Sequence, residues 1–105
     1  DTSKYTLIVQ NNAVAVPLGE NMNYQDIFLL TSGSLGSPFY QTVQTVLQIV
    51  TSDQLKMSGG DIKTVYPLQI TANSTLINAA STIDVSGACS ISTQYFNMER
   101  SNLNV

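Results

Sequence analysis

The side chains that most often carry out catalysis are scarce in this chain. Its 105 residues include no histidine and a single cysteine, Cys89. Without histidine, Ser-His-Asp and Cys-His nucleophilic catalysis, the commonest zinc sites and a histidine pH switch are all excluded. Cys89 has the parity of a residue on the inner face of a strand, so we interpret it as a small packing residue rather than a catalytic thiol.

Carboxylates are the remaining route to catalysis. The seven acidic residues are widely separated, and the segment IDVSG at 83–87 has one residue too many for the Asp-Thr/Ser-Gly run of paired-aspartate peptidases. Neither a D-x-D-x-D-G calcium loop nor a glycine-rich phosphate-binding motif occurs. We therefore predict no catalytic, cofactor-binding or metal-binding residues. An enzyme that uses only carboxylates and hydroxyls is the least favoured hypothesis.

Ligand binding is a second chemistry that the side chains permit. A flat aromatic ring stacks on the apolar face of a sugar, while neighbouring amides bond its hydroxyls. Most of the five tyrosines and three phenylalanines fall on expected core faces, and Tyr40 and Tyr95 are the least firmly placed there. These two tyrosines are the predicted ligand contacts. Asn73-Ser74-Thr75 is an acceptor sequon for N-glycosylation.

Composition narrows the class of protein. Charged residues make up 10% of the chain, against about 25% in an average soluble protein. Serine, threonine, asparagine and glutamine replace them, a composition that favours an extracellular, cell-surface or virion location. The four cations, with a net charge of -3, are too sparse to follow a nucleic-acid backbone. No apolar stretch approaches the roughly 20 residues of a membrane span.

Two further expectations follow from the sequence as it stands. A single cysteine allows no internal disulfide, so stability has to come from a hydrophobic core. The chain starts with Asp1 and not with methionine, and we interpret it as one domain, residues 1–105, cut from a longer parent.

The elements that must position these residues begin with a predicted hairpin. In the segment YTLIVQNNAVAVPL at 5–18, a two-residue Asn11-Asn12 loop would place Val9 opposite Val14 and Leu7 opposite Val16. Asparagine tolerates the positive φ that such a turn requires. The pattern therefore predicts two antiparallel strands with one apolar face.

A helix is predicted near 37–57. Ser37 suits the N-cap, Pro38 suits the first helical position, and Gly59-Gly60 can end the helix. Several β-branched residues in this segment lower helix propensity, so a pair of strands remains the alternative.

The second half predicts sheet. Ile62, Thr64, Tyr66, Leu68 and Ile70 alternate with more polar residues, and an Asn73-Ser74 turn would make a second hairpin. Alternation continues over 83–95 as a long strand, with Gly87 as a candidate bulge. Pro67 indicates an edge position. We find no repeat with the period of a solenoid.

The fold predicted from these elements is α+β. It has an antiparallel sheet of about five strands, two tight hairpins, a long C-terminal strand and one covering helix. The alternative is an all-β sandwich.

The function predicted for this fold is a non-enzymatic structural or assembly module of a virion, tail, pilus or cell surface. It would act through contacts between protein subunits in a homo-oligomer or larger assembly. The alternative is a small glycan- or ligand-binding adhesion domain. No cofactor is expected.

Overall fold

The computed structural model describes residues 4–15, 22–35 and 46–105, and within them it contains strands and no helix. The strands are β1 (Thr6–Val9), β2 (Val14–Ala15), β3 (Met22–Leu30), β4 (Ser34–Leu35), β5 (Leu47–Ser58), β6 (Asp61–Thr64), β7 (Leu68–Asn78), β8 (Thr82–Val85), β9 (Cys89–Met98) and β10 (Asn102–Asn104). All pairings between them are parallel.

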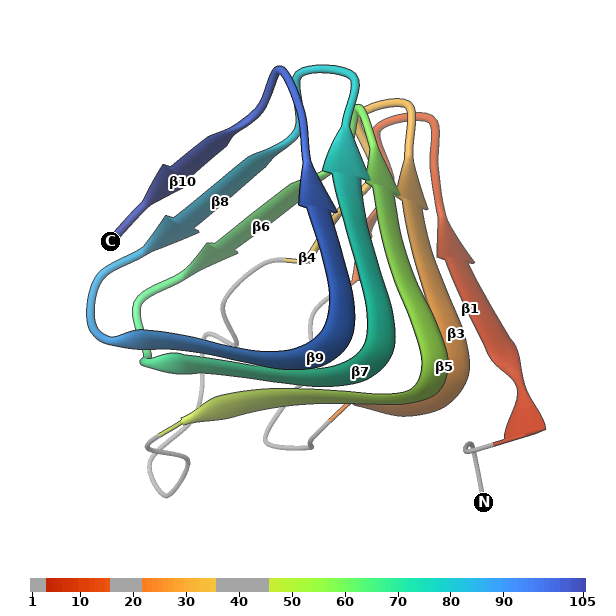
Figure 1. Ribbon diagram of the computed structural model, residues 1–105. Helices are drawn as coiled ribbons and strands as arrows, with labels where there is room; N and C mark the ends of the chain where they lie inside the picture. Colours follow the sequence, from red (N-terminus) through yellow and green to blue (C-terminus); the bar gives the residue numbers. More distant parts are fainter. Residues whose placement is uncertain (1–3, 16–21, 36–45) are drawn as a thin grey trace.

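The chain winds as a β-solenoid. Odd-numbered strands form one sheet in the order β1-β3-β5-β7-β9, and even-numbered strands form a second in the order β10-β8-β6-β4-β2. Each rung is therefore one odd strand followed by one even strand. Figure 1 shows that the long odd strands bend, so that a rung of the C-terminal half runs along three sides of a rough triangle.

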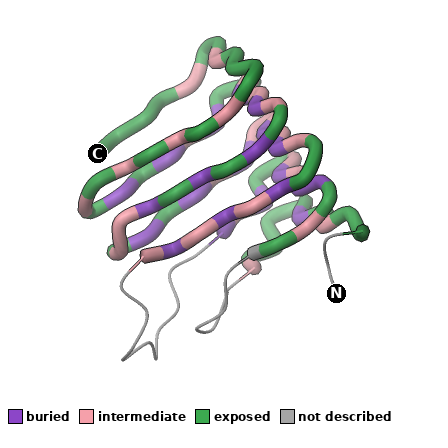
Figure 2. The backbone as a smooth tube through the Cα atoms, turned by 60° about the horizontal axis from the view of Figure 1, so that its bottom comes forward, coloured by how far each residue is buried: buried purple, intermediate pink, exposed green. Residues whose placement is uncertain are grey.

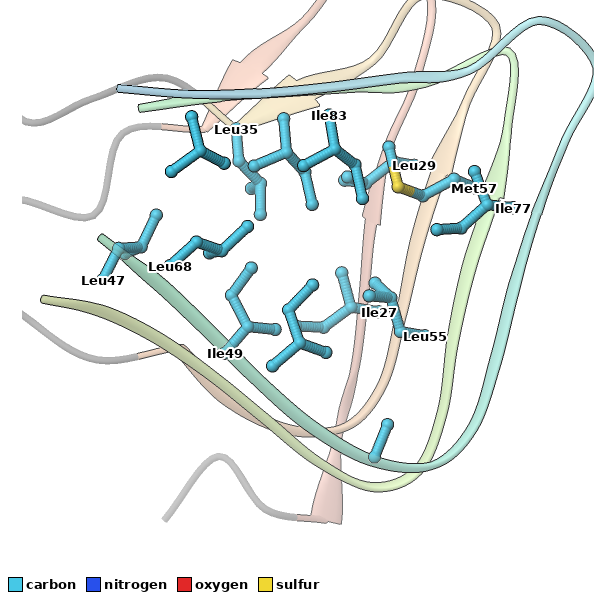
Figure 3. Close-up of a cluster of buried hydrophobic side chains, with 14 of the residues drawn as sticks. Ile27, Leu29, Leu35, Leu47, Ile49, Leu55, Met57, Leu68, Ile77 and Ile83 are labelled. Atoms are coloured by element: carbon cyan, nitrogen blue, oxygen red, sulfur yellow. The ribbon is translucent and has the colours of Figure 1, made fainter. Parts of the chain in front are cut away.

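Stacking of the rungs builds the core. Residues one rung apart lie side by side on neighbouring strands, as Leu47, Leu68 and Cys89 do. Inward positions are apolar and outward positions are polar, because side chains alternate between the two faces of a strand. The result is a set of apolar columns that run along the solenoid axis and fill its interior (Figure 3).

One corner of the solenoid is built in nearly the same way in every rung. Between the odd and the even strand, the chain turns through residues with positive φ, which include Asn11, Asn12, Thr31, Ser32 and Gly59. Backbone amides in these turns donate to carbonyls of the following rung, as the Thr31 amide does to Ser58 (3.0 Å). Asparagine and glycine accept this backbone readily.

A column of small residues lies just inside this corner. Ala13, Gly33, Gly60, Ser81 and Ser101 each follow the turn and precede the even strand. A Cβ atom on Gly33 would collide with the Val9 carbonyl, and one on Gly60 would lie 2.5 Å from the Leu29 carbonyl oxygen. Close approach of successive rungs therefore requires glycine at these two positions.

Serine takes over from glycine in the later rungs and adds hydrogen bonds. The Gly60 amide donates to Ser81 Oγ (3.0 Å), and Ser81 Oγ donates to the Asn78 carbonyl (2.7 Å). One rung further on, the Ser81 amide donates to Ser101 Oγ (3.1 Å). These bonds satisfy amides at a buried corner, where an unpaired donor would be costly.

The bend of the odd strands is the second special feature of each rung. Pairing shifts register between Tyr24 and Asp26 in β3 and between Val50 and Gln54 in β5. Asp26 is nearly buried there, and its Oδ1 accepts the Gln54 amide (3.2 Å). A carboxylate thus accepts the Gln54 backbone N–H at the point where the register shifts.

This architecture shows that the predicted α+β fold is wrong. The residues around Asn11-Asn12 do adopt positive φ, yet β1 and β2 do not pair with each other and belong to different sheets. Asn73-Ser74 is not a turn, since both residues lie within β7 at its bend. A pair of residues with positive φ can close a hairpin, but in this protein the pair forms a corner between the two sheets of the solenoid.

The predicted helix near 37–57 is also wrong wherever the structure describes it. Residues 47–57 lie in β5, and residues 37–45 fall outside the described residues. The β-branched residues that weakened the helix prediction occupy a strand, where they pack well. The all-β sandwich is incorrect in topology, because the strands pair in parallel from rung to rung.

Three smaller predictions change with the fold. A repeat of about 21 residues exists after all, as positions 47, 68 and 89 of one column show. Pro67 lies at a corner between β6 and β7 and not on a sheet edge. Gly87 lies at the equivalent corner between β8 and β9, so it is not a bulge within one long strand.

Candidate functional site

Among the described residues, no rung covers the inward face of the rung that β9 and β10 form. Phe96 occupies the column of Leu55 and Thr75, but 49% of its surface is exposed, and Leu103 in the column of Ile62 and Ile83 is 40% exposed. Figure 2 shows the contrast between the buried middle rungs and the exposed C-terminal rung. The inward positions of β9 and β10 are thus core positions with no rung above them among the described residues.

A pocket of about 370 Å³ opens at this end of the solenoid. It is lined by Cys89, Ile91, Thr93, Phe96, Leu103 and Val105, and we call it the end pocket. Burial raises the pKa of the Cys89 thiol above its ordinary value. The thiolate is therefore disfavoured near neutral pH. Cys89 is partly buried and packs against the core cluster, as the packing interpretation expects.

A second pocket lies on the outer surface at the bend of β5, β7 and β9. Its volume is about 530 Å³, and it is lined by Gln54, Ser74, Thr75, Leu76, Gln94, Tyr95, Phe96 and Asn97. We call it the bend pocket. Gln54, Ser74 and Tyr95 lie in register on three neighbouring strands, so the pocket spans three rungs. None of these lining side chains carries a charge.

The structure describes only one of the two predicted ligand contacts. Tyr95 lies in the bend pocket, is 62% exposed and sits on strand β9. Tyr40 lies outside the described residues. Sequence reasoning did not place Gln54 and Ser74 beside Tyr95, because they approach it only through the stacking of rungs.

Asn73 is exposed at the bend of β7, next to Ser74 of the bend pocket. Its carbonyl accepts a hydrogen bond from Thr93 Oγ1 (3.3 Å). Thr75, the third residue of the sequon, is buried, and its Oγ1 donates to Thr93 Oγ1 (3.2 Å). The sequon therefore lies in a paired strand and not in the hairpin turn that we predicted.

Other kinds of site find little support in the described part of the chain. No cluster of three or more cysteine and acidic side chains there could hold a metal ion. Among the same residues, no helix has the length and apolar character to cross a bilayer.

Comparison of the chain with models of protein families, with curated proteins and with solved structures found no match.

Proposed function

We propose that this chain is a non-enzymatic structural module whose copies dock end to end. The observation that carries the proposal is the uncovered inward face of the last rung, where Phe96 and Leu103 occupy core positions but remain exposed. Exposed apolar surface of this kind is typical of an interface with another protein.

The two ends of the solenoid are complementary as strand edges. The first sheet ends in β1 and β9, and the second ends in β2 and β10. A second copy placed on the C-terminal end would pair its β1 with β9 and its β2 with β10, and both new pairings would be parallel. Residues 6–9 and 89–98 contain no charged residue and no proline, so neither edge carries the usual protection against pairing.

The apolar columns also continue across such a contact. Leu7 heads the column that ends at Phe96, and Val9 heads the column that ends at Met98. Ala15 likewise begins the column that ends at Leu103. A docked copy would therefore place apolar side chains on apolar side chains without a change of register.

Docking of one end on the other is a heterologous contact, and because each copy would add along the solenoid axis, the contact repeats without closing into a ring. The product is a linear stack of copies. Such a stack suits the shaft or fibre of a cell surface or virion, which is the extracellular location that the composition favours.

Light scattering and sedimentation over a range from low to high micromolar concentration test the proposal. We expect the mean mass of the wild-type chain to rise with concentration and that of Leu103→Lys to stay at the monomer, because a buried unpaired charge would enter the interface. Val65→Lys, at a residue that is exposed in a middle rung, is the matched control and should assemble normally.

A mixing experiment distinguishes stacking from symmetric pairing. A Leu103→Lys copy keeps its N-terminal end and can cap a stack, so adding it to wild-type chain should shorten the assemblies. A wild-type chain that stays monomeric at high micromolar concentration would overturn the proposal.

The thiol of Cys89 gives an independent readout of the same contact. Because burial raises its pKa, alkylation of Cys89 should be slow at neutral pH and should accelerate as pH rises. Docking would cover the end pocket, so the alkylation rate of the wild-type chain should fall as its concentration rises. An unchanged rate in a chain that assembles would place the contact elsewhere and contradict end-to-end docking.

A further inference from the structure

The bend pocket is a second candidate binding surface. It opens on the outer side of the bend, and it shares Phe96 with the end pocket and includes residues of the edge strand β9. Gln54, Ser74 and Tyr95 form its central column, one residue from each of three rungs. Neighbouring strands lie about 4.8 Å apart, so the three side chains follow one line along the solenoid axis.

The depth of the pocket comes from the differing size of these side chains. Ser74 is the smallest of the three and lies between Gln54 and Tyr95. The serine therefore forms the floor, while the glutamine and the tyrosine form walls. Leu76 of β7 and Asn97 of β9 extend the lining, and they pair with each other across the two strands.

The lining combines two aromatic rings, Tyr95 and Phe96, with several neutral hydrogen-bonding groups. Gln54, Gln94 and Asn97 each carry an amide that both donates and accepts, and Ser74 adds a hydroxyl. Tyr95 presents an aromatic ring that is 62% exposed. A ligand that matches this lining is uncharged, has many hydroxyls and also has an apolar face.

We infer that the bend pocket binds a neutral saccharide, with Tyr95 stacked on a sugar ring and the amides bonded to its hydroxyls. A charged ligand would find no opposite charge in the lining. An apolar peptide would leave the amides of Gln54 and Gln94 without partners, which is costly once they are desolvated.

The chain supplies a matched control for the tyrosine. Tyr5 is 64% exposed, about the same as Tyr95, but it lies before β1 at the opposite end of the first sheet and lines neither the end pocket nor the bend pocket. An effect of exposure alone would be equal at the two tyrosines. An effect of the bend pocket would be confined to Tyr95.

The test uses the Leu103→Lys chain, so that its outcome does not depend on assembly. This chain is applied to an array of neutral oligosaccharides, and the strongest binder is titrated by NMR. We expect Tyr95→Ala to weaken binding by about tenfold or more, equivalent to ~1.4 kcal/mol. Gln94→Ala should weaken it less, and Tyr5→Ala should leave it unchanged.

The substitution Tyr95→Phe separates the ring from its hydroxyl, and we expect it to retain most of the binding. The far-ultraviolet circular dichroism of every variant is compared with that of the parent chain, to confirm that each is folded. Absence of binding across the array would overturn the inference. Equal loss in the folded Tyr5→Ala and Tyr95→Ala variants would do the same.

Discussion

The enclosed middle rungs and the last rung have the same inward pattern but very different burial. Leu55 and Thr75 are almost completely buried, and Phe96 in the same column is half exposed. Ile62 and Ile83 are fully buried, while Leu103 beside them is not. In this solenoid, then, strand formation alone does not bury an inward side chain at the C-terminal end, whereas the same column positions are buried in the middle rungs, which have a rung on each side.

The largest expected effect comes from shortening two side chains of one column, Ile83 in a middle rung and Leu103 in the last rung. Ile83→Ala should lower the free energy of unfolding by about 2–5 kcal/mol, since it leaves a cavity in an enclosed rung. Leu103→Ala in the last rung should lower it by less than about 1 kcal/mol, because solvent already reaches that side chain.

Urea denaturation at low protein concentration measures both of these variants. Low concentration keeps assembly from adding burial at Leu103. Similar losses for the two variants would mean that the last rung is as enclosed as the middle ones, which would contradict the comparison.

A smaller effect is expected at the glycine corner. Gly33→Ala would place a Cβ atom against the Val9 carbonyl, and Gly60→Ala would do so against Leu29. Such overpacking typically costs about 1–3 kcal/mol. Gly87→Ala is the matched control, because its nearest neighbour would be a side-chain atom of Pro67 at 3.3 Å.

Thermal unfolding distinguishes these glycine variants. The melting temperatures of Gly33→Ala and Gly60→Ala should fall clearly, and that of Gly87→Ala should change little. A fall at Gly87 equal to that at Gly60 would show that the loss reflects removal of glycine in general and not the approach of two rungs.

Alanine substitutions of Ser81 and Ser101 at this corner should also differ between a middle rung and the last rung, with smaller losses of stability. Ser81→Ala leaves the Gly60 amide without its acceptor at a buried position, which costs about 1–2 kcal/mol. Ser101→Ala removes the bond to the Ser81 amide, but that amide keeps the Asn78 carbonyl as an acceptor (3.3 Å), and water can reach the last rung. Hydrogen exchange of the Gly60 and Ser81 amides reports each loss separately, and equal acceleration at both would argue against an open last rung.

Local features of this fold could be predicted from the sequence. Alternation placed Ile62, Ile70 and Ile83 on inward faces, and all three are buried. The Asn11-Asn12 pair indicated a turn with positive φ, which the structure contains. These signals depend on neighbours within a few residues, and short segments carry them reliably.

The partner of each strand could not be predicted in the same way. A two-residue turn with positive φ fits a hairpin and a solenoid corner equally well. The repeat that would have decided between them is hard to detect in the sequence. Equivalent positions in successive rungs face inward but differ in residue type, as Leu68 and Cys89 show. The longer interval from Ile27 to Leu55 also breaks the period.

Sequence reasoning predicted only part of the candidate site. Tyr95 was predicted as a ligand contact, and it does lie in a pocket. Gln54 and Ser74 are distant from it in sequence and meet it only through rung stacking. The end pocket could not be predicted either. The sequence indicates that a residue faces inward, but whether another rung covers that residue depends on the order of the rungs.

The smallest expected effect tests whether the two kinds of rung differ in burial alone. Ala80 in a middle rung and Arg100 in the last rung both have positive φ, of 62° and 50°. Glycine removes the steric cost of this backbone but adds entropy to the unfolded chain. Ala80→Gly and Arg100→Gly should therefore each stabilise the protein by roughly 0.5–1 kcal/mol, because backbone strain is local and needs no covering rung. Asn12→Gly should gain less, since asparagine tolerates this conformation. Chemical denaturation of the three variants checks the order, and a gain at Ala80 without one at Arg100 would mean that the last corner is not held in the same conformation.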